Sequence, residues 1–98
     1  MEKIIAGRHL EVSDGIKEYI MTELGKIEDD YHKLTSARVV LDVQRSLYSA
    51  EIILHGKNLS IEAKGQSNQI RPSISSAIDK TKRQLKKHLD KVQNHHTH

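Results

Sequence analysis

The chain of 98 residues contains no cysteine, no tryptophan and no phenylalanine, and only one proline. The lack of cysteine excludes disulfides, thiolate metal sites and a cysteine nucleophile, and it fits a reducing compartment. No apolar run approaches the length of a membrane span, and the start of the chain is too polar for a signal peptide. We therefore expect a cytoplasmic protein without a membrane segment.

The core has to be built from aliphatic side chains, because the only aromatic residues are three tyrosines. A chain of this length can form one domain with one modest core. Charged residues make up 30% of the chain, yet the apolar residues recur at regular spacings, which indicates a folded domain rather than disorder. We expect a single domain over residues 1–92, followed by a flexible tail over residues 93–98 that contains histidines.

Two segments have the apolar spacing of amphipathic helices. The first runs from about Asp14 to Tyr31, with Ser13 as its N-cap. The second runs from Ile74 to Val92, with Pro72 in the opening turn, where its missing N–H does no harm. The apolar side of this second helix consists of Ile74, Ala77, Ile78, Thr81, Leu85, Leu89 and Val92.

Four segments are predicted to be strands, namely residues 3–8, 37–45, 50–55 and 59–65. In the last three, apolar residues alternate with polar ones, and their short connections favour antiparallel hairpins. The predicted order is β-α-β-β-β-α, which is an α+β fold. We expect a two-layer sandwich in which a four-stranded sheet has two helices packed on one face.

The positive charge is concentrated near the end of the chain. The net charge is +3, but residues 71–98 carry seven lysines and arginines against two acidic residues, while residues 1–70 have a net charge of −2. Positive charge gathered on one rigid element is typical of a polyanion binder. A helix face with lysines selected only for helix propensity and solubility is the alternative. Solubility does not require segregated charge, so the pattern favours nucleic acid as the ligand.

Three other functions are compatible with parts of the sequence. A small phosphohydrolase of the acylphosphatase type needs a strand after the second helix, and the candidate pair Asp42 and His55 on the outer sheet face has no nucleophile beside it. A double-stranded RNA-binding module starts with a helix rather than a strand. A transition metal could bind His95, His96 and His98, although a terminal cluster is more often a solvated tail. We expect no catalytic residues, no metal site and no cofactor.

Several segments together resemble one known family. They read IAGRHLEVS over residues 5–13, IKEYI and LGKIE in the first helix, RVVLDV over 38–43, AEIILHG over 50–56 and AIDKTKRQLKKHLDKV over 77–92. Their order and spacing resemble the ribosome hibernation promoting factor and ribosome-associated inhibitor family, also called protein Y or sigma-54 modulation protein. The likeness extends over residues 5–92.

This resemblance implies a bacterial cytoplasmic protein that silences idle ribosomes in stationary phase or under stress. It would occupy the mRNA–tRNA channel of the small ribosomal subunit, contact 16S rRNA near the decoding site and ribosomal proteins, and be a monomer off the ribosome. The rRNA-binding residues carried over by position are Lys17, Lys26, Lys80, Arg83, Lys87, His88 and Lys91. Helical periodicity adds Lys82 and Lys86 to this set.

The chain departs from the family pattern at three places. The run Ser67–Ile74 before the second helix is longer, with Arg71 where relatives have a tyrosine. Glu23 stands where relatives often have a further lysine. Neither a long second domain nor a long acidic extension follows the second helix, so the short hibernation promoting type is the nearest match.

Overall fold

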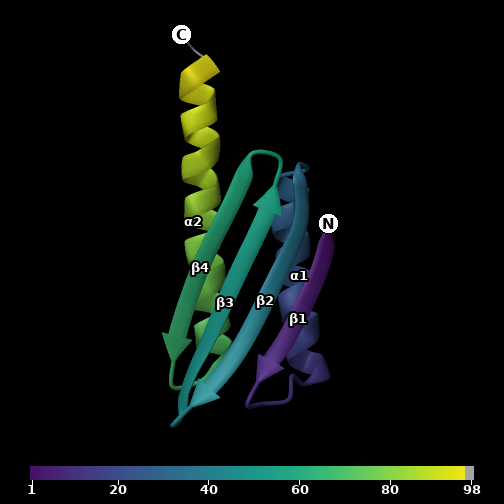
Figure 1. Ribbon diagram of the computed structural model, residues 1–98, viewed down its shortest axis with the longest axis vertical. Helices are drawn as coiled ribbons and strands as arrows, with labels where there is room; N and C mark the ends of the chain where they lie inside the picture. Colours follow the sequence, from purple (N-terminus) through teal and green to yellow (C-terminus); the bar gives the residue numbers. More distant parts are fainter. Residues whose placement is uncertain (97–98) are drawn as a thin grey trace.

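Four strands and two helices follow one another in the order β-α-β-β-β-α, which confirms the expected α+β fold (Figure 1). The computed structural model describes the backbone of residues 1–96 and the side chains of residues 1–89. The elements are β1 (Glu2–Arg8), α1 (Asp14–Asp30), β2 (Leu34–Gln44), β3 (Leu47–Gly56), β4 (Leu59–Ser67) and α2 (Ile70–His96).

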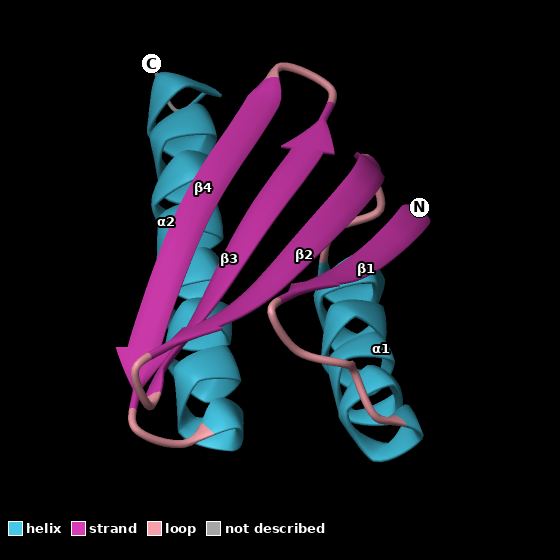
Figure 2. Ribbon diagram, turned by 60° about the horizontal axis from the view of Figure 1, so that its bottom comes forward, coloured by secondary structure: helices cyan, strands magenta, loops and turns pink. Residues whose placement is uncertain are grey.

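The strands form one mixed sheet in the order β1-β2-β3-β4. β1 pairs with β2 in parallel, so α1 provides the crossover between them, whereas β2, β3 and β4 pair as the expected antiparallel hairpins. Both helices cover the same face of the sheet (Figure 2), which confirms the two-layer sandwich. β1 and β4 are left as the edge strands, and α2 lies against β4 and β3.

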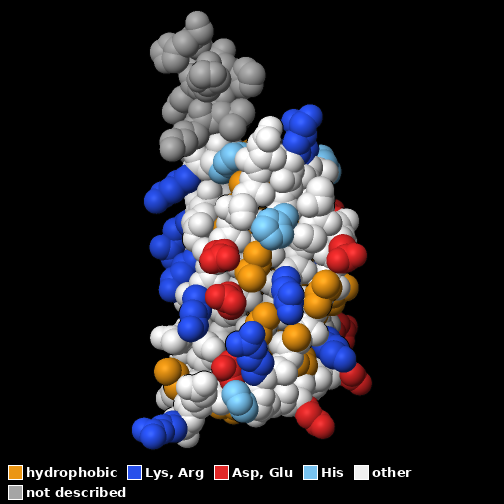
Figure 3. All heavy atoms as spheres, viewed as in Figure 1, with side chains coloured by type: hydrophobic (Ala, Val, Ile, Leu, Met, Phe, Trp, Pro, Cys, Tyr) orange, Lys and Arg blue, Asp and Glu red, His pale blue; other side chains and the backbone are white. Residues whose placement is uncertain are grey.

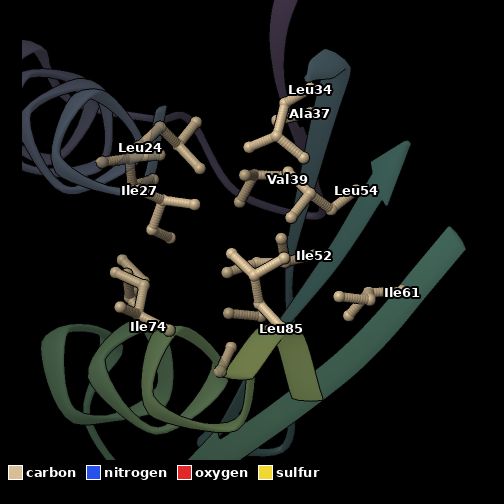
Figure 4. Close-up of a cluster of buried hydrophobic side chains, with 14 of the residues drawn as sticks. Leu24, Ile27, Leu34, Ala37, Val39, Ile52, Leu54, Ile61, Ile74 and Leu85 are labelled. Atoms are coloured by element: carbon tan, nitrogen blue, oxygen red, sulfur yellow. The ribbon is translucent and has the colours of Figure 1, made fainter. Parts of the chain in front are cut away.

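The core between the two layers is aliphatic, as the composition predicts. Figure 4 shows Leu24 and Ile27 of α1 facing Val39 of the sheet, with Ile74 and Leu85 of α2 on the same side. Each fully buried aliphatic side chain contributes roughly 1.5–3 kcal/mol through removal of apolar surface from water. Most apolar residues of the predicted strands are buried, among them Val39, Leu41, Ala50, Ile52, Leu54, Leu59, Ile61 and Ala63. Val43 of β2 and Leu89 of α2, which were expected on the inner side, are only half-buried.

The positions where the helices begin and end depend on capping and first-turn residues more than on the spacing of apolar residues. Ser13 caps α1 as expected, and its Oγ accepts a hydrogen bond from the backbone N–H of Ile16 at 3.2 Å. α2 begins at Ile70, earlier than the predicted start at Ile74, because Pro72 is compatible with the first helical turn. The helix also continues past Val92 as far as His96, so residues 93–96 of the expected tail are helical. Residues 97–98 lie outside the described part of the chain, and the flexibility of the tail stays a prediction.

Gly65 fixes how closely α2 approaches the sheet. A Cβ atom at Gly65 would lie 2.6 Å from the backbone nitrogen of Ala77 and would also overlap the carbonyl oxygen of Ser73. Only glycine therefore allows the first turns of α2 to pack directly on β4. Neither described helix is both long and apolar enough to cross a bilayer.

Candidate nucleic-acid interface

The outer side of α2 is a continuous set of exposed cations. No carboxylate of residues 1–89 lies within ion-pair distance of any of them. The acidic character of the first 70 residues therefore does not neutralise this helix through direct contacts in that part of the chain. The exposed cations are Lys80, Lys82, Arg83, Lys86 and Lys87.

These cations form two adjoining rows on the helix. Lys80, Arg83 and Lys87 are spaced by three and four residues, so they share one side of the helix. We call these three residues the β4-side row. Lys82 and Lys86 also share a side, but Lys82 lies roughly 160° around the helix axis from Lys80. Lys86 is three residues after Arg83 and therefore lies beside it, whereas Lys82 lies farther from the β4-side row. RNA binding by Lys82 and Lys86 stays a prediction.

The β4-side row runs along the free edge of the sheet. The Lys80 ammonium donates a hydrogen bond to the carbonyl oxygen of Lys64 at 2.8 Å, and the Gln84 amide donates one to the carbonyl of Glu62 at 2.9 Å. Both carbonyls belong to the edge strand β4, which has no partner strand on this side. These two bonds hold α2 beside the edge, where Figure 3 shows a line of blue side chains.

Between β4 and α2 lies a shallow groove, which we call the β4–α2 groove. It consists of two adjoining hollows of about 350 Å³ each. Lys64 and Lys80 line both hollows, while Arg83 and Lys87 line one of them together with the single carboxylate of Glu62. Lys64 was missed from the sequence, because its alternation with buried neighbours predicts only an outward side chain and not its place opposite α2.

The opposite side of α2 faces α1. The Arg71 guanidinium lies over the Tyr19 ring of α1, 5.2 Å from the ring centroid. Lys82 comes three helical turns after Arg71 and therefore lies on the same side. On α1, Lys26 comes two turns after Tyr19 and pairs with Glu23, with Nζ and Oε2 2.9 Å apart. The hydrogen bond that Lys26 donates to Glu23, together with the negative charge of Glu23, raises the pKa of Lys26. The negative charge of Glu23 therefore offsets the positive charge of Lys26 on the side of α1 that faces α2.

Among the described side chains, those of Lys17 and His88 are not gathered with the β4-side row. Lys17 is exposed but lies nine residues before Lys26, on the opposite side of α1. His88 is half-buried. The side chain of Lys91 lies outside the described residues. Among the described side chains of the predicted set, the structure therefore brings together Lys80, Arg83 and Lys87, with Lys86 beside Arg83.

The outer face of the sheet does not form the candidate catalytic pair. Asp42 Oδ1 is hydrogen-bonded to His9 Nδ1 at 2.9 Å, and this bond is the main reason that the pKa of Asp42 is lowered. His55 is on the same face, but it lies six residues along β3 from Ser49, the partner of Asp42. That spacing corresponds to about 20 Å. Asp42 and His55 therefore do not act on the same group.

Within the described residues, no three His, Cys, Asp or Glu side chains come together in a way that would hold a metal ion. The histidines considered as ligands from the sequence, at positions 95, 96 and 98, have side chains outside the described part of the chain.

Comparison with known proteins identifies relatives over nearly the whole chain. The family model described as sigma 54 modulation protein / S30EA ribosomal protein matches residues 4–93. A ribosome hibernation promoting factor from Escherichia coli is 28% identical over 95 residues, which cover 97% of this chain and 100% of that protein. The factor of the same name from Pseudomonas putida is 29% identical over 93 residues, covering 95% of this chain and 91% of that protein.

Solved structures share the fold. The N-terminal domain of protein Y from Thermus thermophilus has a TM-score of 0.79 at 26% identity, covering 89% of this chain and 98% of that one. A ribosomal subunit interface protein from Coxiella burnetii has a TM-score of 0.86 at 14% identity, covering 92% and 99%, which shows a common fold. Since the family model matches residues 4–93, which include part or all of each of the six helices and strands, the chain belongs to the sigma 54 modulation protein / S30EA ribosomal protein family.

Proposed function

We propose that this chain is a ribosome-binding translation inhibitor that occupies the mRNA–tRNA channel of the small ribosomal subunit and silences idle ribosomes. The names of its full-length relatives, ribosome hibernation promoting factors, support this function. The observation in this chain that carries the proposal is the row of exposed cations on α2, which form no ion pair with a carboxylate of residues 1–89.

A cationic helix of this kind suits a binder of folded RNA. Each lysine or arginine that neutralises a phosphate releases condensed counterions, which supplies affinity without reading the base sequence. Folded rRNA presents its phosphates in a fixed array, so a rigid element can match that array by shape. The aliphatic core beneath α2 supplies the rigidity. Inhibition then follows from occupying the channel, and no chemical step is needed.

The footprint on 16S rRNA is expected to centre on α2 rather than on α1. Arg83 and Lys87 are exposed and point away from the core, whereas Lys26 is paired with Glu23. Lys17 points away from the side of α1 that faces α2. α1 therefore adds less positive potential than its two lysines suggest. Off the ribosome the protein is expected to be a cytoplasmic monomer.

A sucrose gradient of resting cells, probed for the protein, tests this function. We expect recovery in the small-subunit and whole-ribosome fractions at low salt, and release to the top of the gradient at high salt. Recovery only at the top at every salt concentration would contradict the proposal. A second assay measures competition by free duplex RNA. Duplex RNA that binds as tightly as small subunits would instead indicate a general double-stranded RNA binder.

A further inference from the structure

The β4–α2 groove carries positive charge on both of its walls. Lys80, Arg83 and Lys87 form the helix wall, and Lys64 stands on the strand wall. Lys64 is exposed and comes from the sheet, outside the basic helix α2. The cationic surface therefore continues from the helix onto the sheet.

We infer that one RNA strand lies along the β4–α2 groove, with its sugar–phosphate backbone held between Lys64 and the β4-side row. This inference rests on the proposed function, and it specifies which part of the RNA is bound and where. It makes Lys64 an RNA-binding residue of this chain.

The chemistry of the groove favours a phosphate backbone over bases. Four cations face the single carboxylate of Glu62, and no aromatic side chain lines either hollow. Base recognition in single strands depends on stacking platforms, which these walls do not offer. The bases of the bound strand therefore point away from the protein, and binding is independent of sequence.

The cations keep donors available for phosphate oxygens. The Lys80 ammonium donates one of its three N–H groups to the Lys64 carbonyl, so two N–H groups remain for phosphate oxygens. The Arg83 guanidinium can bind two oxygens of one phosphate at once. Lys80 and Lys87 are about 10 Å apart along the helix axis, which is long enough for more than one phosphate.

The β4–α2 groove is preformed in the free protein. The bonds from Lys80 and Gln84 to the edge carbonyls fix α2 beside β4, and Gly65 permits the close approach of the two elements. The two walls therefore keep their spacing in the free protein. A preformed site loses little conformational freedom on binding.

The test compares Lys64→Ala with Arg38→Ala in binding to purified small ribosomal subunits over a range of salt concentrations. Arg38 is the matched control, because it is exposed on β2 and its removal changes the net charge equally. We expect Lys64→Ala to weaken binding and to lower the slope of log affinity against log salt by about one, as loss of one phosphate contact does. Arg38→Ala should leave the slope unchanged.

Equal effects of the two substitutions, or no effect of either, would overturn the inference. A different result would contradict the proposed function itself. That result is unchanged affinity for small ribosomal subunits when Arg83 and Lys87 are both reversed in charge. Thermal unfolding of both alanine variants should match the parent chain, since both side chains are exposed.

A second measurement locates the RNA directly. The chain has no cysteine, so Lys64→Cys and Arg38→Cys each give a single attachment point for an iron–EDTA probe. Hydroxyl radicals from position 64 should cut one short stretch of 16S rRNA in the complex, and radicals from position 38 should cut that stretch weakly or not at all. Absence of cleavage from position 64, with the variant still bound, would also overturn the inference.

Discussion

The guanidinium of Arg71 lies 5.2 Å from the centroid of the Tyr19 ring and thereby joins the start of α2 to α1. At this position the family resemblance leads us to expect a tyrosine, whereas this chain has a cation that lies over an aromatic ring. A cation over an aromatic face at an exposed site is worth about 0.5–1 kcal/mol. The contact helps to fix the side of α2 that carries Lys82.

A double-mutant cycle with Arg71→Ala and Tyr19→Leu tests this contact. The expected coupling in the free energy of unfolding is about 0.5–1 kcal/mol, measured by denaturant titration. Tyr19→Phe serves as the control, because it keeps the ring face and should retain the coupling. A coupling of zero would show that the arginine and the ring are neighbours without an energetic interaction.

Replacement of Gly25 by alanine should stabilise the protein. Gly25 lies within α1, has no positive φ, and a Cβ atom there would meet nothing within 4 Å. The gain should approach 1 kcal/mol, because alanine loses less conformational entropy in a helix. The matched substitution Gly65→Ala should destabilise, since its Cβ would collide with the backbone of α2. Thermal unfolding measures both changes, and equal signs would contradict this account of packing.

Glu28 should make part of the free energy of unfolding dependent on pH. Its carboxylate accepts a hydrogen bond from the Met1 ammonium at 2.7 Å and one from Lys3 at 3.0 Å, and these bonds lower the pKa of Glu28, the Met1 bond most. A carboxyl with a lowered pKa in the folded state stabilises above its unfolded pKa. This stability is lost as the pH falls below about 4.5, through the folded pKa.

The variant Glu28→Gln should therefore be less stable than the parent at neutral pH, and the difference should shrink in acid. Denaturant unfolding at pH 7 and pH 3 measures this. Asp29→Asn is the control, because Asp29 forms no ion pair with residues 1–89. A difference between parent and Glu28→Gln that is constant with pH would contradict the assigned role.

Removal of the carboxylate at Glu23 should strengthen binding to small ribosomal subunits. Glu23→Gln releases Lys26 from its ion pair and removes one negative charge from the side of α1 that faces α2. Exposed pairs of this kind are weak, so the gain in affinity should be severalfold at most. Glu18→Gln makes the same change in net charge without an ion pair in residues 1–89, and it should have a smaller effect. Equal gains would show that only net charge matters.

The sheet and its core could be predicted because period-two and helical spacing report directly which side chains turn inward. Val39, Ile52 and Leu54 are examples, and each is almost fully buried. The start of α2 was harder to predict, because Arg71 and Pro72 interrupt the apolar pattern while remaining compatible with a first helical turn.

The site was predicted only in part, because it depends on which strand lies beside α2. Lys80, Arg83 and Lys87 were expected from the family resemblance, but Lys64 lies beside them only through the pairing order of the sheet. Helical periodicity added Lys82 and Lys86 as residues flanking the β4-side row, and their part in binding stays a prediction. The ion pair between Lys26 and Glu23 could be predicted from the sequence, because the two residues are three positions apart in a helix.

The most direct test of the central claim measures the affinity of purified small ribosomal subunits for the Arg83→Glu, Lys87→Glu double variant. The control is Lys33→Glu with Arg38→Glu, two exposed residues outside α2 whose reversal gives the same change in net charge. We predict that the α2 variant binds about a hundredfold more weakly, since two charge-assisted contacts of ~1.4 kcal/mol or more are lost, while the control binds nearly as the parent does. Parent-like affinity of a folded α2 variant near physiological salt would contradict the claim that this helix binds the ribosome.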